Sequence, residues 1–133
     1  MTRLRSTIAA LAIALMAAFV AVGATPAAPA HAVTYSVSGR LVDLNTGHAV
    51  ANALIVVKDV EGGMVAIGRT HSGTRGYFTV ANLPAVDGYA VFVDGRLVGY
   101  RAGYVTATHR ISTWGNAIAF GPGNLGTVKL RHA

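Results

Sequence analysis

The stretch from Ser72 to Val93 constrains the fold most. Two short runs rich in β-forming residues, Tyr77 to Val80 and Tyr89 to Val93, flank a link that contains Pro and Gly. This pattern predicts two strands joined by a tight connection. The link from Leu83 to Tyr89 also predicts a tyrosine corner, in which the phenol of Tyr89 bonds back to nearby backbone and pins a crossover between two sheets.

The N-terminal segment 1–32 predicts a secretory signal peptide. Two arginines precede an apolar run from Ile8 to Val22, and Ala30 and Ala32 supply the small-x-small pattern of a cleavage site. A retained membrane anchor is the alternative, but a membrane span needs about 18 apolar residues and this run is shorter. We therefore expect a secreted, extracellular chain that begins after Ala32 and has no membrane association once cleaved.

The composition after the leader limits the possible functions. Removing Arg3 and Arg5 from the eleven basic residues leaves nine against five acidic ones. This excess favours an anionic partner such as a cell-wall polymer. Nucleic acid is not expected, because the basic residues are spread along the chain and export removes that partner. The absence of cysteine excludes thiol catalysis, thiolate metal sites and disulfides, so packing alone must hold the fold.

The segment 33–133 predicts a single all-β domain. Apolar and polar residues alternate from Tyr35 to Leu41, as in a half-exposed strand. Glu61 to Gly63 and Asp94-Gly95 predict hairpin connections, and 114–124 predicts a long loop. Strands are expected at 33–42, 53–60, 64–70, 77–80, 89–93, 96–100, 104–111 and 125–130. With no helical periodicity, these indicate a single antiparallel β-sandwich of about seven strands, Greek-key or transthyretin-like, with helix content near zero.

Several motifs resemble a known family. They are Val37 to Asp43, then Thr46-Gly47, then Gly76 to Val80, followed by Leu83-Pro84 and Gly88-Tyr89. Together they resemble the carboxypeptidase regulatory-like domains, which have a transthyretin-like or carbohydrate-binding-like sandwich. The resemblance covers roughly Val33 to Val93. It implies a module that accompanies a catalytic domain without being catalytic itself, and its turn glycines and core residues specify a fold better than a function.

A patch between Arg96 and Trp114 is the candidate ligand-binding site. Arginine interleaved with aromatic residues can bind anionic polymers through charge and sugars through ring stacking. The alternative is a simple strand pattern, with arginines in water and aromatic rings in the core. The candidate residues are Arg96, Tyr100, Arg101, Tyr104, Arg110 and Trp114.

No catalytic, metal or cofactor residue is predicted. His48, His71, His109 and His132 lie at no ligand spacing, so we interpret them as surface histidines. The five acidic residues fall at expected turns or strand ends. Some transthyretin-like proteins hydrolyse 5-hydroxyisourate, but the C-terminal Tyr-Arg-Gly-Ser signature of those enzymes is absent.

These features predict a secreted, non-enzymatic module that binds cell-envelope material or extracellular polysaccharide, or has a structural role there. A small transthyretin-like hydrolase is one alternative. A structural subunit that associates through an exposed sheet edge is the other. The sequence leaves the ligand and the oligomeric state open. Self-crosslinking is set aside, because the first strand offers Arg40 where that chemistry needs a lysine.

Overall fold

The computed structural model describes residues 33–133, of which 34–133 form one compact unit. The predicted signal peptide and its cleavage residues, Ala30 and Ala32, lie outside the described residues.

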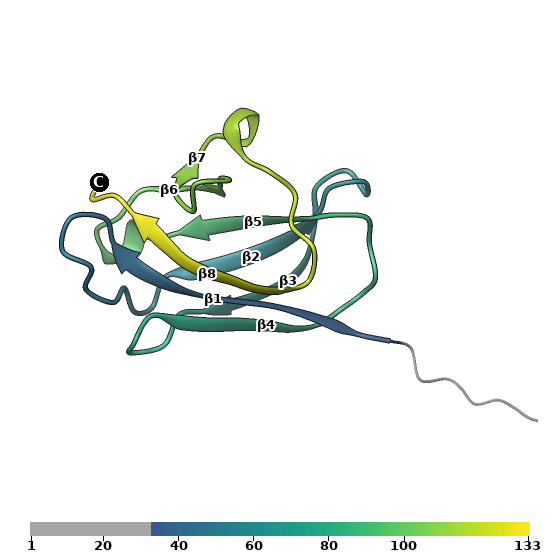
Figure 1. The fold of residues 1–133 in the computed structure, drawn as a ribbon, viewed down its shortest axis with the longest axis horizontal. Helices are drawn as coiled ribbons and strands as arrows, with labels where there is room; N and C mark the ends of the chain where they lie inside the picture. The colour runs from purple at the N-terminus through teal and green to yellow at the C-terminus, as the bar shows by residue number, and fades with distance from the viewer. Residues whose placement is uncertain (1–32) are drawn as a thin grey trace, which may run out of the picture. The chain divides into compact units, whose positions relative to one another are not determined.

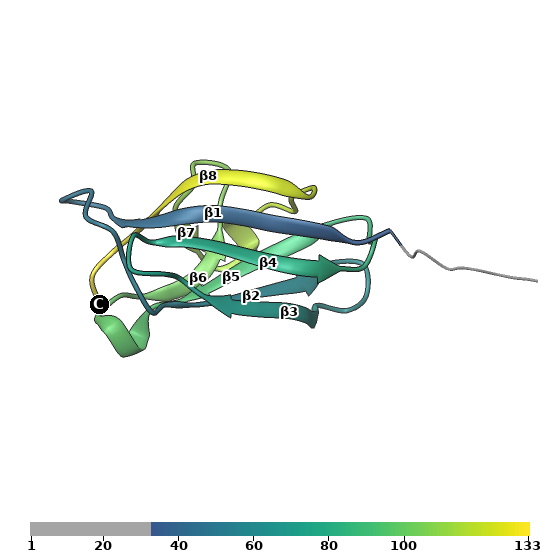
Figure 2. The same cartoon turned by 90° about the horizontal axis from the view of Figure 1, so that it is seen from below.

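Eight strands form two sheets, which confirms the all-β sandwich (Figures 1 and 2). One sheet has three strands in the order β4-β1-β8, and the other has five in the order β3-β2-β5-β6-β7. Within the described part of the chain, only two 3₁₀ turns are helical. The elements are β1 (Tyr35–Asp43), β2 (Leu54–Asp59), β3 (Val65–His71), β4 (Tyr77–Leu83), β5 (Tyr89–Asp94), η1 (Arg96–Val98), β6 (Ala102–Val105), β7 (Ile111–Ser112), η2 (Trp114–Asn116) and β8 (Gly123–Leu130).

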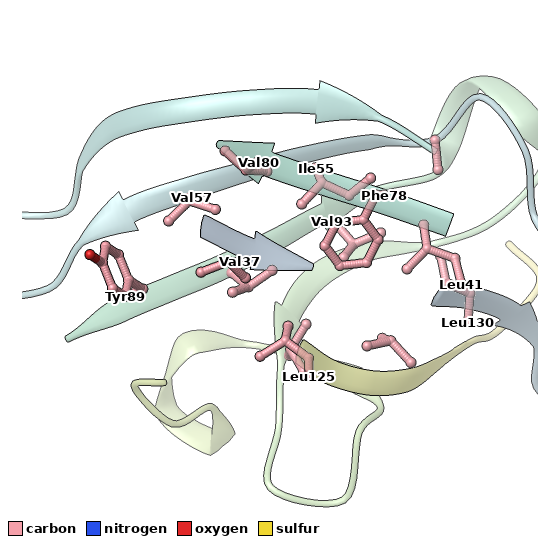
Figure 3. Close-up of a cluster of buried hydrophobic side chains, with 14 of the residues drawn as sticks. Val37, Leu41, Ile55, Val57, Phe78, Val80, Tyr89, Val93, Leu125 and Leu130 are labelled. Carbon is pink, nitrogen blue, oxygen red and sulfur yellow. The ribbon is translucent and has the colours of Figure 1, made fainter. Parts of the chain in front are cut away.

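The core lies between the two sheets, where alternate residues of facing strands meet (Figure 3). Val37 and Leu41 of β1 are fully buried, and so are Ile55 and Val57 of β2. Burying a side chain of this kind contributes about 1.5–3 kcal/mol. The residues that alternate with them necessarily point outward, so each sheet presents an outer face that the core does not use.

The tyrosine corner is confirmed. The Tyr89 side chain is 1% exposed, and its hydroxyl donates a hydrogen bond to the backbone oxygen of Pro84 at 2.6 Å. Pro84 belongs to the link between β4 and β5, which lie in different sheets. Burial raises the pKa of the Tyr89 phenol, so the hydroxyl keeps the proton that it donates.

Acidic residues form turns, as the sequence predicts. The Asp43 Oδ1 atom accepts hydrogen bonds from the amides of Asn45 and Thr46, at 2.7 and 3.0 Å. Asp59 Oδ1 accepts one from the Gly62 amide at 3.0 Å, inside the expected β2–β3 hairpin. These carboxylates satisfy backbone donors that a strand end would leave free.

The expectation of a purely antiparallel sandwich is wrong at one pair. β1 pairs with β4 in the antiparallel direction, but it pairs with β8 in parallel. The last strand therefore reaches the first from the other end of the sandwich, by way of the loop that carries η2 (Figure 1).

Two other local predictions are also wrong. Asp94-Gly95 makes no two-residue hairpin, because Gly95 has a φ of −99° and the Asp94 carboxylate caps the amide of Arg96. The segment 96–100, expected as a strand, begins instead with η1. The segment 104–111 is divided between β6 and β7 by a turn at which His109 has a φ of +61°.

Candidate functional site: an aromatic platform on the five-stranded sheet

Three aromatic rings and one ammonium group gather on the outer face of the five-stranded sheet. We call Lys58, Phe92, Tyr104 and Trp114 the platform. Lys58 of β2 and Phe92 of β5 alternate with core residues of their strands, so both point away from the core. Tyr104 of β6 pairs directly with Phe92, and Trp114 follows from η2.

The rings of the platform contact one another edge to face. The Phe92 and Tyr104 centroids are 5.0 Å apart at an interplanar angle of 64°, and those of Tyr104 and Trp114 are 5.4 Å apart at 65°. Edge-to-face packing fixes each ring against its neighbour. Trp114 is 37% exposed, so part of its indole remains open to a ligand.

Lys58 adds a positive charge beside these rings. Its Nζ atom donates a hydrogen bond to the Tyr104 hydroxyl at 2.8 Å. The same atom lies 5.1 Å from the Phe92 centroid and 5.2 Å from that of Tyr104. Among residues 33–133, the ion pairs are Arg96 with Asp94 and His132 with Asp43, so no carboxylate neutralises Lys58. The ammonium group is held in place with its charge still available.

A second pair of cations borders the platform. Arg101 and Arg131 line a hollow of about 380 Å³ together with Ser112 and Thr113. Ser112 pairs with Tyr104 across β6 and β7, and Thr113 directly precedes Trp114. A hollow that offers two guanidinium groups and two hydroxyls thus lies next to the platform.

The structure brings together only part of the predicted site. Tyr104 and Trp114 lie in contact and Arg101 borders them, whereas Arg110 lines a second hollow, which shares Ser112 with the hollow of Arg101. Arg96 forms an ion pair with Asp94 at 2.7 Å. Tyr100 donates its hydroxyl to Asp43 at 2.8 Å.

Lys58 and Phe92 were missed, although the sequence carried a signal for each. Lys58 is the one charged residue in the apolar run 54–58. On the neighbouring strand of the sheet, Phe92 alternates with core residues in the same way as Lys58 does. A strand order that placed 54–59 beside 89–94 would have put both on one face.

Sequence reasoning also missed a cluster at the far end of β1, formed by Asp43, Tyr100 and His132. The Asp43 side chain is 3% exposed, and its Oδ2 atom contacts both the Tyr100 hydroxyl and His132 Nε2, the latter at 2.5 Å. The Tyr100 and His132 rings stack with centroids 4.5 Å apart. The hydrogen bond from Tyr100 holds the pKa of the Asp43 carboxyl well below its usual range. His132 remains 59% exposed, but a buried carboxylate orients it, which no spacing in the sequence indicated.

Within residues 33–133, no three His, Cys, Asp or Glu side chains are grouped so that they could hold a metal ion. The helices of the same part of the chain are all too short or too polar to cross a membrane.

Comparisons with known proteins give distant likenesses. No family model and no curated protein matches this chain. It is similar to part of a 9R-lipoxygenase from Cyanothece, with 15% identity and a TM-score of 0.46, over 77% of this chain and 18% of that one. It is also similar to part of the pilus 2b backbone protein of group B streptococcus, with 14% identity and a TM-score of 0.44, over 74% of this chain and 41% of that one. This chain therefore spans less than half the length of either protein.

Proposed function

We propose that this protein is a secreted, non-catalytic module that binds an anionic polysaccharide of the cell envelope through the platform. The single observation that carries the proposal is the Trp114, Tyr104 and Phe92 cluster with an unneutralised Lys58 on the outer face of the five-stranded sheet. The resemblance to carboxypeptidase regulatory-like domains supports a role without catalysis.

The chemistry of the platform suits such a ligand. An exposed aromatic ring offers a flat apolar surface to the C–H face of a sugar. The cations at its borders attract carboxylate, sulfate or phosphate groups on the same polymer. Because neighbouring groups already hold the rings and Lys58 in place, these side chains lose little conformational entropy on binding.

Co-sedimentation with purified acidic wall polymer and with a neutral glycan tests the proposal. Binding to the acidic polymer is expected at low salt and should weaken as added salt screens the charges. Replacing Trp114 by Ala should weaken binding about tenfold, which corresponds to about 1.4 kcal/mol. Lys58→Met keeps the apolar stem and should reduce the salt dependence.

Tyr35→Ala is the matched control, because Tyr35 is 36% exposed, almost as much as Trp114, and lies on β1 of the other sheet. It should bind as the unmodified protein does. Failure of every acidic polymer to retain the protein at low salt would refute the proposal, and so would an equal loss in the Trp114 and Tyr35 variants.

A small hydrolase is the second candidate, and one contact favours it. A buried carboxylate that orients an exposed imidazole is a common arrangement for general acid–base catalysis, and Asp43 and His132 have this geometry. Asp43 also accepts bonds from Tyr100 and two backbone amides, which favours a structural role. Turnover of an ester or cyclic-amide panel that is lost in His132→Ala would establish the hydrolase instead.

A further inference from the structure

The outer face of the three-stranded sheet carries a polar hollow of about 330 Å³, on the side of the sandwich opposite the platform. Its size is at the low end for ligand pockets and suits one small group. The residues that line it with outward-pointing side chains are Ser38, Arg40, Tyr77, Thr79, Asn124 and Thr127.

A bulge in β8 borders this hollow. Along the parallel pair, Ser38 faces Asn124 but Arg40 faces Thr127, so β8 holds one residue more than β1 over this interval. Gly126 lies in the bulge with a φ of +83°, and a methyl group added there would meet no atom within 4 Å. The bulge thus leaves open space where a regular strand would present a side chain.

Arg40 projects a fixed cation into this space. Its Nε–H donates a hydrogen bond to the backbone oxygen of Arg75 at 2.9 Å, and its guanidinium lies 5.1 Å from the centre of the Tyr77 ring. Neither ion pair of the described residues includes Arg40. Its two terminal nitrogens therefore remain available as a fork that matches a carboxylate or sulfate group.

The other polar groups of the hollow are also able to donate. Asn124 Oδ1 accepts a hydrogen bond from the Gly126 amide at 2.7 Å, which leaves the side-chain NH₂ group to donate elsewhere. Ser38, Thr79 and Thr127 each add a hydroxyl, and no carboxylate lines the hollow. A site made of donors around one cation selects a ligand rich in acceptors and negatively charged.

We propose that this hollow is a second binding site, separate from the platform, which takes one acidic sugar residue. The carboxylate pairs with Arg40, the ring lies beside Tyr77, and the sugar hydroxyls reach Thr79, Asn124 and Thr127. The choice of a sugar rests on the proposed function, whereas the requirement for an anion rests on the hollow alone. Because the two sites face away from each other, one molecule can hold two polymer strands.

Amide chemical shifts of the purified protein provide the test, with glucuronate as the probe. Glucose has the same ring without the carboxylate, and acetate has the carboxylate without the ring. Glucuronate should shift the amides of Gly39, Gly126 and Thr127 in a saturable way, with a Kd of about 1 mM. Glucose should cause no shift, and acetate should bind at least tenfold more weakly.

Single substitutions test whether the amide shifts come from glucuronate bound in the hollow. Arg40→Ala should weaken glucuronate binding at least tenfold, and Thr127→Val should weaken it severalfold with little change in shape. Arg69→Ala, which removes an exposed cation on β3, should have no effect. Trp114→Ala should leave binding in the hollow unchanged, so the test of the hollow remains valid even if the platform binds no polymer. Equal affinity for acetate and glucuronate, an unaltered Kd in Arg40→Ala, or no shift at all would overturn the proposal.

Discussion

Replacing Tyr89 by Phe tests the hydrogen bond that fixes the crossover between the two sheets. The substitution keeps the buried ring and removes only the hydroxyl, which donates to the Pro84 oxygen at 2.6 Å. A neutral hydrogen bond contributes about 0.5–1.5 kcal/mol net, and a buried acceptor left without a partner costs about 1–3 kcal/mol. Pro84 is exposed, so water can replace the lost donor and the smaller value applies.

We therefore expect Tyr89→Phe to lower the free energy of unfolding by about 1 kcal/mol. For a domain of this size, that loss lowers Tm by about 4–8 °C. Urea unfolding followed by circular dichroism measures the change, and the m value should stay constant because the fold is unchanged.

Tyr77→Phe is the matched control. Tyr77 is 61% exposed, and its hydroxyl makes no hydrogen bond to another described residue. Its loss should therefore change the free energy of unfolding by less than about 0.5 kcal/mol. If Tyr89→Phe and Tyr77→Phe unfold at the same urea concentration, the corner bond contributes nothing and the reasoning fails.

Three further predictions concern single sites. Gly76 has a φ of +82°, and an added Cβ would lie 2.3 Å from the Leu41 carbonyl oxygen. Gly76→Ala should therefore destabilise by at least about 3 kcal/mol in urea unfolding, against about 1–2 kcal/mol for Gly99→Ala, where φ is +90° but the space is open. The pKa of the Asp43 carboxyl is lower in the folded than in the unfolded chain, so its contribution is present above about pH 4 and is lost as pH falls through the folded pKa. Asp43→Asn should accordingly flatten the loss of stability between about pH 5 and pH 2 in acid titrations, and a steepness equal to that of the unmodified protein would contradict this. Tyr100→Phe removes the main cause of the shift and should raise the Asp43 pKa measured by carboxyl-carbon NMR; an unchanged value would show that the backbone amides dominate.

The sequence predicts the sandwich well where local chemistry decides the structure. Alternation in β1, the turn-forming carboxylates of Asp43 and Asp59, and the Tyr89 corner all depend on residues close together in the chain. Prediction fails at Asp94-Gly95, because the carboxylate caps Arg96 and the glycine never adopts a positive φ. A dipeptide that permits a tight hairpin also permits this alternative.

Residues that meet only through the sheet order were harder to predict. Tyr104 and Trp114 are near in sequence and were placed in the candidate site, whereas Lys58 and Phe92 join them through strand pairing between β2, β5 and β6. The contact between Asp43 and His132 joins two residues that are far apart in the sequence. No local pattern encodes it, so only the packed structure reveals it.

The parallel pairing of β1 with β8 determines when this protein can finish folding. β1 is the central strand of its sheet, but its two partners are β4 and β8, which comes last among the described strands. Contacts between residues so far apart in sequence form slowly, because a long loop must close first. One edge of β1 therefore stays unpaired, and open to strands of other chains, until β8 reaches it.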